Sequence, residues 1–153
     1  MKRAAAIIAC VLCLACGRKG PVKPPEFVHP ATITDLQASN EADAIALSWE
    51  RPTRYADGSR MTDLGEFRIE RATGGAVAFD PIATLPVTDR ERFQQITRFR
   101  FSDRGVEEGE SYRYRVVSST IDGYASEPSN VVTIVRQAAA AVSATPSPEK
   151  KKE

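Results

Sequence analysis

Hydrophobic residues in the middle of the chain recur at every second position, and this period limits the fold more than any other feature. Ile45, Leu47 and Trp49 alternate with small residues, and Phe67 and Ile69 alternate with charged ones. A period of two places successive side chains on opposite faces of a β-strand. The pattern therefore predicts half-buried strands rather than amphipathic helices.

The same alternation continues toward the C-terminus, with Phe99 and Phe101 in one segment and Tyr112, Tyr114 and Val116 in the next. Turns that contain glycine separate the segments, and no helical segment is expected between them. Several short strands without intervening helices favour an all-β antiparallel sandwich in one domain. The expected strands cover residues 31–38, 43–50, 66–72, 77–86, 96–102, 111–119 and 130–136.

The segment VEEGESYRYRV, residues 106–116, is similar to the motif L-x-P-G-x-x-Y-x-x-x-V of fibronectin type III domains. Valine and glutamate stand where the motif has leucine and proline. The segments FRIER at 67–71 and SEPSN at 126–130 resemble other strands of the same family. The resemblance covers residues 31–136 and implies a seven-stranded, immunoglobulin-like sandwich.

Two aromatic residues have a structural role in this interpretation. Trp49 and Tyr112 both fall on the inward positions of their strands. The resemblance implies that Tyr112 is the tyrosine corner, whose hydroxyl bonds back to the backbone near the preceding turn. We therefore place neither residue in a binding site.

The N-terminus has the pattern of a secretory signal. A basic start, MKR, precedes the uncharged, apolar residues 4–15, which are too few to span a bilayer. A cysteine directly after such a run resembles the lipobox of bacterial lipoproteins, which implies cleavage after residue 15 and acylation, including palmitate, of Cys16. Cys10 would leave a shorter apolar run, and Cys13 follows a bulky leucine, so both fit less well.

The residues after this cysteine carry a second resemblance. CGRKGP, residues 16–21, is similar to the CG-x-KGP start of small lipoproteins associated with the lipopolysaccharide-export translocon. It implies a location at the outer membrane, facing the periplasm. The proline-rich segment 16–30 is expected to be an extended tether of about 40 Å. The Ala-, Pro- and Lys-rich tail 137–153 is expected to be disordered.

The residue inventory contains no constellation that would make the chain an enzyme. His29, the only histidine, lies in the proline-rich segment without a neighbouring cysteine or acidic cluster. A Ser-His-acid triad or a zinc site therefore cannot be assembled around it. The 21 basic and 20 acidic residues give no overall bias toward nucleic acid. We predict no enzyme activity, cofactor, metal site or nucleic-acid partner.

Loops that share one end of the sandwich are the first candidate for a binding surface. If the strands alternate in direction, loops 51–65, 88–96 and 118–129 lie at the end where the chain enters the domain. They mix aromatic residues with adaptable polar ones, as recognition loops do. The predicted partner-binding residues are Arg54, Tyr55, Arg60, Phe93 and Tyr124.

A second candidate is an outward row of arginines, Arg68, Arg113 and Arg115, on strands expected to be neighbours. This row could meet phosphate or sulfate. Glu70 lies alongside, and pairing across the strands is the simpler interpretation.

These features predict an envelope protein that is anchored to the membrane through acylated Cys16. Its fibronectin type III domain is expected to be a non-catalytic module that binds an envelope protein, in outer-membrane assembly. The alternative is an accessory module that binds glycan or peptidoglycan. Aromatic residues flat on one sheet would favour glycan, whereas aromatic residues at the loops would favour a protein.

Overall fold

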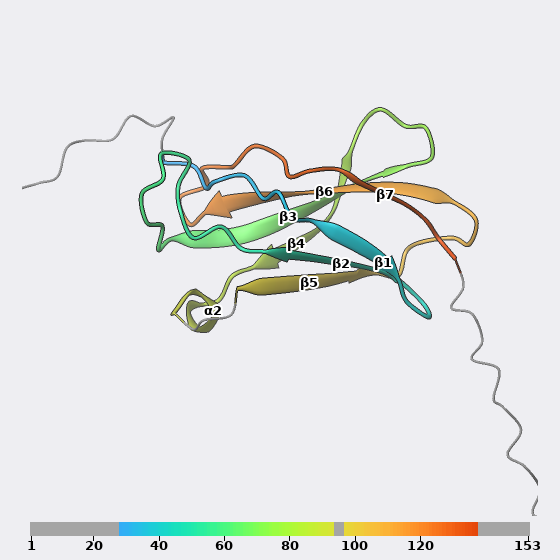
Figure 1. Cartoon of the computed structure of the whole chain (residues 1–153), viewed down its shortest axis with the longest axis horizontal. Coiled ribbons are helices and arrows are strands. Elements are labelled where there is room, and N and C mark those ends of the chain that lie inside the picture. The colour runs from blue at the N-terminus through green and yellow to red at the C-terminus, as the bar shows by residue number, and fades with distance from the viewer. Residues whose placement is uncertain (1–27, 94–96, 138–153) are drawn as a thin grey trace, which may run out of the picture.

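The computed structural model describes residues 28–93 and 97–137, which form seven strands and one short helix (Figure 1). The predicted signal peptide, the attachment site Cys16 and nearly all of the predicted tether and tail lie outside these residues. The elements are β1 (Gln37–Asn40), β2 (Ile45–Glu50), β3 (Leu64–Thr73), β4 (Asp80–Pro86), α2 (Asp89–Phe93), β5 (Arg98–Asp103), β6 (Ser111–Thr120) and β7 (Val132–Val135).

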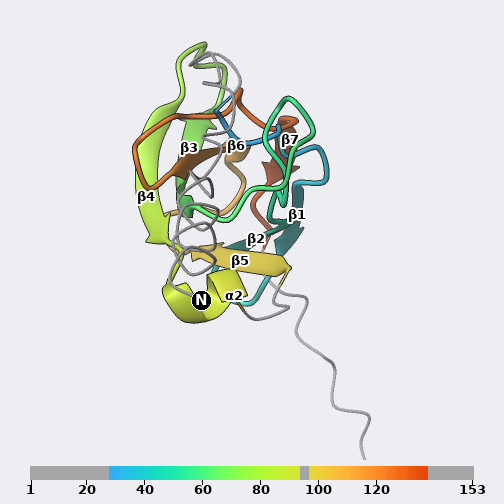
Figure 2. The same ribbon diagram turned by 90° about the vertical axis from the view of Figure 1, so that its left-hand side faces the viewer.

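The strands form two antiparallel sheets, which confirms the predicted all-β sandwich. One sheet has the order β1-β2-β5, and the other has the order β4-β3-β6-β7. Figure 2 looks at the sandwich from the end where α2 lies, beside the edge formed by β5. Consecutive strands β4 and β5 belong to different sheets, so the segment that contains α2 crosses from one sheet to the other.

Three aromatic rings join the two sheets at the centre of the core. Trp49 of β2 meets Phe67 of β3 edge to face, with ring centroids 5.4 Å apart, and Phe67 lies 4.7 Å from Phe99 of β5. All three side chains are buried. Burying a large apolar side chain stabilises the fold by about 1.5–3 kcal/mol. The inward position of Trp49 in the alternating pattern is thus confirmed.

Tyr112 forms the tyrosine corner that the sequence predicts. Its ring is buried, and its hydroxyl accepts a hydrogen bond of 2.8 Å from the backbone N–H of Glu107. The bond ties the turn before β6 to the strand itself.

The first strand begins at residue 37 instead of 31, because the preceding backbone bonds to a different partner. The side-chain amide of Asn130 accepts from the N–H of Leu36 and donates to its carbonyl, both at 3.0 Å. These backbone groups are therefore satisfied by a side chain rather than by a neighbouring strand. Ile33 and Leu36 are still buried, as the alternation indicates.

The helix α2 replaces part of a segment that was expected to be a loop. Glu91 accepts hydrogen bonds from the N–H and the hydroxyl of Thr88, each at 2.8 Å, and its own N–H donates back to that hydroxyl at 3.3 Å. This reciprocal arrangement is a capping box, which satisfies the free N–H groups at the start of a helix. The sequence Thr88-Asp-Arg-Glu91 carries that signal.

Candidate functional site

Three loops meet at the end of the sandwich where the described chain begins, as the alternation of strands predicts (Figure 1). The N–H of Ala56 donates to the carbonyl of His29 at 3.0 Å, which fixes the entering chain to the loop before β3. The N–H of Ile121 donates to the carbonyl of Asp63 at 2.8 Å, which joins this loop to the one after β6. We call residues 51–63, α2 and residues 121–131 the loop end.

Gly65 allows two of these loops to approach closely. A Cβ atom at this position would lie 2.8 Å from the carbonyl oxygen of Thr120 and 2.9 Å from the nitrogen of Ile121. Both distances are shorter than non-bonded contacts allow, and both atoms belong to the backbone. The absence of a side chain at Gly65 is therefore required for the packing of the loop end.

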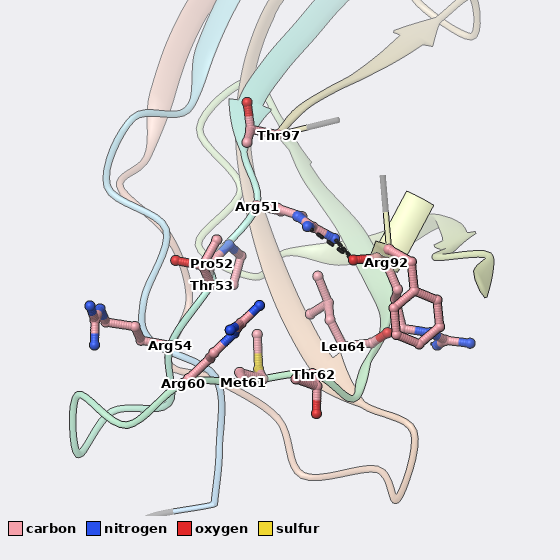
Figure 3. Close-up of a pocket in the computed structure, with 11 residues that line it drawn as sticks. Arg51, Pro52, Thr53, Arg54, Arg60, Met61, Thr62, Leu64, Arg92 and Thr97 are labelled. Carbon is pink, nitrogen blue, oxygen red and sulfur yellow. Dashed lines mark hydrogen bonds between the residues drawn. The ribbon is translucent and has the colours of Figure 1, made fainter. Parts of the chain in front are cut away.

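A cleft of about 810 Å³ opens at the loop end, between the loop that follows β2 and the helix α2 (Figure 3). Its volume is within the range of small-molecule pockets. Among the residues that the structure describes, no carboxylate lines it, whereas four arginines do. We call it the arginine cleft, with Arg51, Arg54, Arg60 and Arg92 around its sides and Met61 and Leu64 at its base.

Arg51 and Arg92 hold α2 against the sandwich. The guanidinium of Arg51 donates to the backbone carbonyls of Glu91, at 2.8 Å, and of Arg92, at 3.2 Å. The guanidinium of Arg92 donates to the carbonyl of Leu64 at 2.9 Å and forms an ion pair with Asp89. Both arginines are thus positioned, and one wall of the cleft is fixed by them.

Arg54 and Arg60 lie opposite each other in the loop before β3. They are the two partners of an isolated antiparallel bridge. Arg54 donates to the carbonyl of Gly58 at 2.7 Å, and the guanidinium of Arg60 has no hydrogen bond or ion pair with any residue that the structure describes. In Figure 3 Arg60 points toward the middle of the cleft and Arg54 points outward at one side.

Exposed apolar side chains stand beside the cleft. Phe93, at the last position of α2, is 80% exposed and also lines the cleft. In the loop after β6, Ile121 is 61% exposed and Tyr124 is 44% exposed. Four of the five predicted residues, Arg54, Arg60, Phe93 and Tyr124, are therefore presented to solvent at one end.

Tyr55, the fifth predicted residue, packs toward the core instead. Its ring lies against the hydrophobic core, and its hydroxyl donates to the carboxylate of Asp63 at 2.6 Å. Burial, together with this hydrogen bond and the charge of Asp63, raises the pKa of Tyr55 to about 12. Its role is to support the loop from below.

Two arginines of the outward row pair with one carboxylate at neighbouring positions of the sheet, which supports the simpler interpretation. Glu70 accepts from Arg68 at 2.8 Å and from Arg115 at 2.6 Å. Burial opposes the charge of Glu70, but the two guanidinium groups outweigh it and lower the pKa of the carboxyl. Arg113 and Arg115 also lie over the ring of Phe79, at 5.3 and 4.4 Å.

The described residues contain neither a metal-binding cluster nor a membrane-spanning helix. Within residues 28–93 and 97–137, no group of three or more His, Cys, Asp or Glu side chains is arranged to hold a metal ion. The same part of the chain contains no helix that is long and apolar enough to span a membrane.

Arg51 and Arg92 line the cleft but are not among the five predicted binding residues, although Arg92 lies in one of the loops expected to recognise a partner. The capping-box sequence at 88–91 could have indicated the helix and with it the position of Arg92. Arg51 has no such signal, because its role depends on backbone carbonyls 40 residues later in the chain.

No family model matches the chain, and no curated protein matches it. Solved structures share its fold. An Fn3-like protein from Clostridium thermocellum matches with a TM-score of 0.50 and 20% identity, over 72% of this chain and 97% of that one. The fold is that of a fibronectin type III domain.

Two larger proteins also contain a region with this fold. The twitchin kinase region from C. elegans matches with a TM-score of 0.52 and 19% identity, over 71% of this chain and 17% of that one. A β-1,2-glucanase from Parabacteroides distasonis matches with a TM-score of 0.53 and 20% identity, over 78% of this chain and 14% of that one. At these identities the likeness concerns the fold alone.

Proposed function

We propose that this fibronectin type III domain is a non-catalytic module that recognises a protein of the bacterial cell envelope. The loop end carries the proposal, because it combines an open cleft with exposed aromatic and basic side chains. Arginine and tyrosine are enriched among the residues that dominate the energy of protein interfaces. Phe93 and Tyr124 add rigid apolar area, which costs little side-chain entropy on binding.

The attachment of the domain supports a partner at a membrane. In our proposal, acyl chains on Cys16 anchor the protein, and the tether joins the domain at residues 28–30, beside the loop end. Two acyl chains are enough for stable anchoring. The loop end would then lie on the membrane side of the domain. The similarity of residues 16–21 to translocon-associated lipoproteins favours the outer membrane and its periplasmic face.

The positions of the exposed aromatic residues favour protein binding over glycan binding. Carbohydrate recognition by a sandwich would use an aromatic ring lying free on a sheet. Phe79, beside the outer face of the larger sheet, is covered by Arg113 and Arg115 instead. The freely exposed rings in the described chain, Phe93 and Tyr124, are at the loop end.

The test is affinity purification of the tagged full chain from detergent-solubilised envelopes, followed by quantitative mass spectrometry. We expect one defined envelope protein to co-purify with the wild type and to be lost with Phe93→Ala and Tyr124→Ala combined. Val77→Ala is the matched control, because Val77 is 92% exposed in the turn between β3 and β4, far from the loop end. Co-purification that is equal in all three proteins would contradict the proposal.

The anchor is tested separately. Cells grown with an alkyne analogue of palmitate should label the wild-type protein and leave Cys16→Ser unlabelled. Equal labelling of both proteins would contradict acylation at Cys16. Release of the unlabelled variant from the membrane fraction would show that the acyl chains, rather than the partner alone, hold the protein there.

A further inference from the structure

We infer that the arginine cleft binds an extended, acidic segment of the partner protein, with its carboxylates on the arginines and an apolar side chain against Phe93. The inference rests on the proposed function and names the chemistry of the segment that is recognised. It is carried by the charges and the shape of the cleft.

Three of the four arginines of the cleft have no carboxylate partner in the described chain. Arg51, Arg54 and Arg60 form no ion pair with the part of the chain that the structure describes, and only Arg92 has one, with Asp89. Elsewhere in the domain each of six arginines lies within 4.0 Å of a carboxylate: Arg68, Arg71, Arg98, Arg100, Arg104 and Arg115. Outside the cleft, Arg113 and Arg136 also lack a carboxylate partner in the described chain, but they donate to backbone carbonyls.

Two of the cleft arginines share one backbone bridge. Arg54 and Arg60 are partners in this bridge, and Arg60 points toward the middle of the cleft while Arg54 points outward at one side. Neither charge has a carboxylate partner in the part of the chain that the structure describes. Guanidinium groups match carboxylates with paired hydrogen bonds, so an acidic ligand would supply the missing partners.

The shape of the cleft favours several separate anions over one phosphate. Figure 3 shows Arg51 directed at α2, Arg60 toward the middle of the cleft and Arg54 outward at one side, so the guanidinium groups do not converge on one point. Arg51 already donates to the carbonyls of Glu91 and Arg92, so its guanidinium is not directed at the same anion as that of Arg60. A peptide with two or more acidic side chains along an extended backbone fits this arrangement.

The apolar parts of the cleft indicate a peptide that carries apolar side chains as well as acidic ones. Met61 and Leu64 form its base and are nearly buried already, at 7% and 3% exposure. Phe93 is the large apolar group left open to solvent at its rim. We therefore expect an aliphatic or aromatic side chain next to the acidic ones in the bound segment.

The experiment is a selection of random 12-residue peptides, displayed on phage, against the full chain carrying Cys16→Ser. We expect enrichment of peptides in which Asp or Glu recurs beside an apolar residue. The selection is repeated on the Arg54→Gln/Arg60→Gln double variant and on Arg104→Gln. Arg104 is an exposed arginine paired with Asp43, outside the cleft, and serves as the matched control.

The enriched peptide, synthesised and labelled, should bind the double variant about tenfold or more weakly, because hydrogen bonds to charged groups are lost. Arg104→Gln should bind within about twofold of the wild type, and added salt should weaken binding. Peptides without acidic enrichment, no enrichment, or equal binding by the double variant would overturn the inference. Binding of phosphatidylglycerol vesicles that depends on Arg54 and Arg60, without peptide enrichment, would assign the cleft to lipid phosphate and also overturn it.

The peptide selection and the co-purification experiment test the acidic segment and the proposed function separately. If an envelope protein co-purifies through Phe93 and Tyr124 while the selection yields no acidic peptides, the module role stands and the acidic segment is wrong. If no envelope protein co-purifies and no acidic peptide is enriched, both the proposed function and the acidic segment are wrong.

Discussion

Arg54 and Arg60 stand opposite each other across a single antiparallel bridge, and neither has an ion pair with a carboxylate of the described chain. Arg54 donates to the carbonyl of Gly58, whereas the guanidinium of Arg60 has no hydrogen bond or ion pair with the described residues. Removal of the Arg60 charge should therefore weaken binding without a loss of stability.

Arg60→Gln is expected to change the free energy of unfolding by less than about 0.5 kcal/mol, because the exposed guanidinium makes no hydrogen bond or ion pair with the described residues. The same substitution should weaken capture of the partner. Urea unfolding followed by the fluorescence of Trp49, the only tryptophan, measures the first effect. Substitutions at exposed positions usually change the free energy of unfolding by no more than about 0.5 kcal/mol. A loss of more than about 1 kcal/mol would therefore show that Arg60 stabilises the fold and would contradict this prediction.

Thr88→Ala should open α2 without unfolding the sandwich. The substitution removes the hydroxyl from the capping box, which costs about 1 kcal/mol. Arg51 would then lose the ordered carbonyls that it binds. Hydrogen exchange of the amides at 89–93 should become faster, while exchange in β3 and β6 stays the same. Thr133→Ala, at an exposed position of β7, is the control, and equal exchange in both variants would contradict this role of the cap.

Gly65→Ala should destabilise the domain by about 1–3 kcal/mol, the usual cost of forcing extra atoms into a packed site. The added methyl group would meet the backbone of Thr120 and Ile121. Gly75→Ala is the matched control, because its methyl group would have no atom within 4 Å. Unfolding in urea compares the two variants, and similar stabilities would contradict the close approach of the loops.

The stability of the domain should depend on pH through Glu70. Its pKa is lowered in the folded state, so the unfolded state binds more protons as pH falls below about 5. The stabilisation is therefore fully present above the unfolded pKa and is lost as pH falls through the folded pKa. Glu70→Gln should lose about 1.5–3 kcal/mol at pH 7 and approach the wild type at pH 3.

Glu66→Gln, at an exposed position of the same strand, is the control for this measurement. Urea unfolding at several pH values between 3 and 7 gives the comparison. A constant difference between the wild type and Glu70→Gln over this range would contradict the assigned ion pairs.

The strand pattern was predictable because it depends on local alternation. Trp49, Phe67 and Phe99 each occupy the inward position of an alternating segment, and the structure brings them into one cluster. The start of β1 was not predictable in this way, since Asn130 binds the backbone of Leu36 from 94 residues away.

The candidate site was predictable only in outline. Strand direction indicates which loops share an end, and Arg54, Arg60, Phe93 and Tyr124 are found there. The position of Tyr55 depends on Asp63, which accepts its hydroxyl and turns the ring toward the core. The cleft itself depends on α2, and this short helix lies in a segment that the alternation of strands predicts to be a loop.

The central claim is that the loop end contacts an envelope protein, and site-specific photo-crosslinking in living cells tests it most directly. A photoreactive amino acid is placed at position 93 in one strain and at position 77 in another. We predict that position 93 forms a covalent adduct with one defined envelope protein and that position 77 does not. Adducts of equal yield from both positions, or an adduct from position 77 alone, would contradict the account.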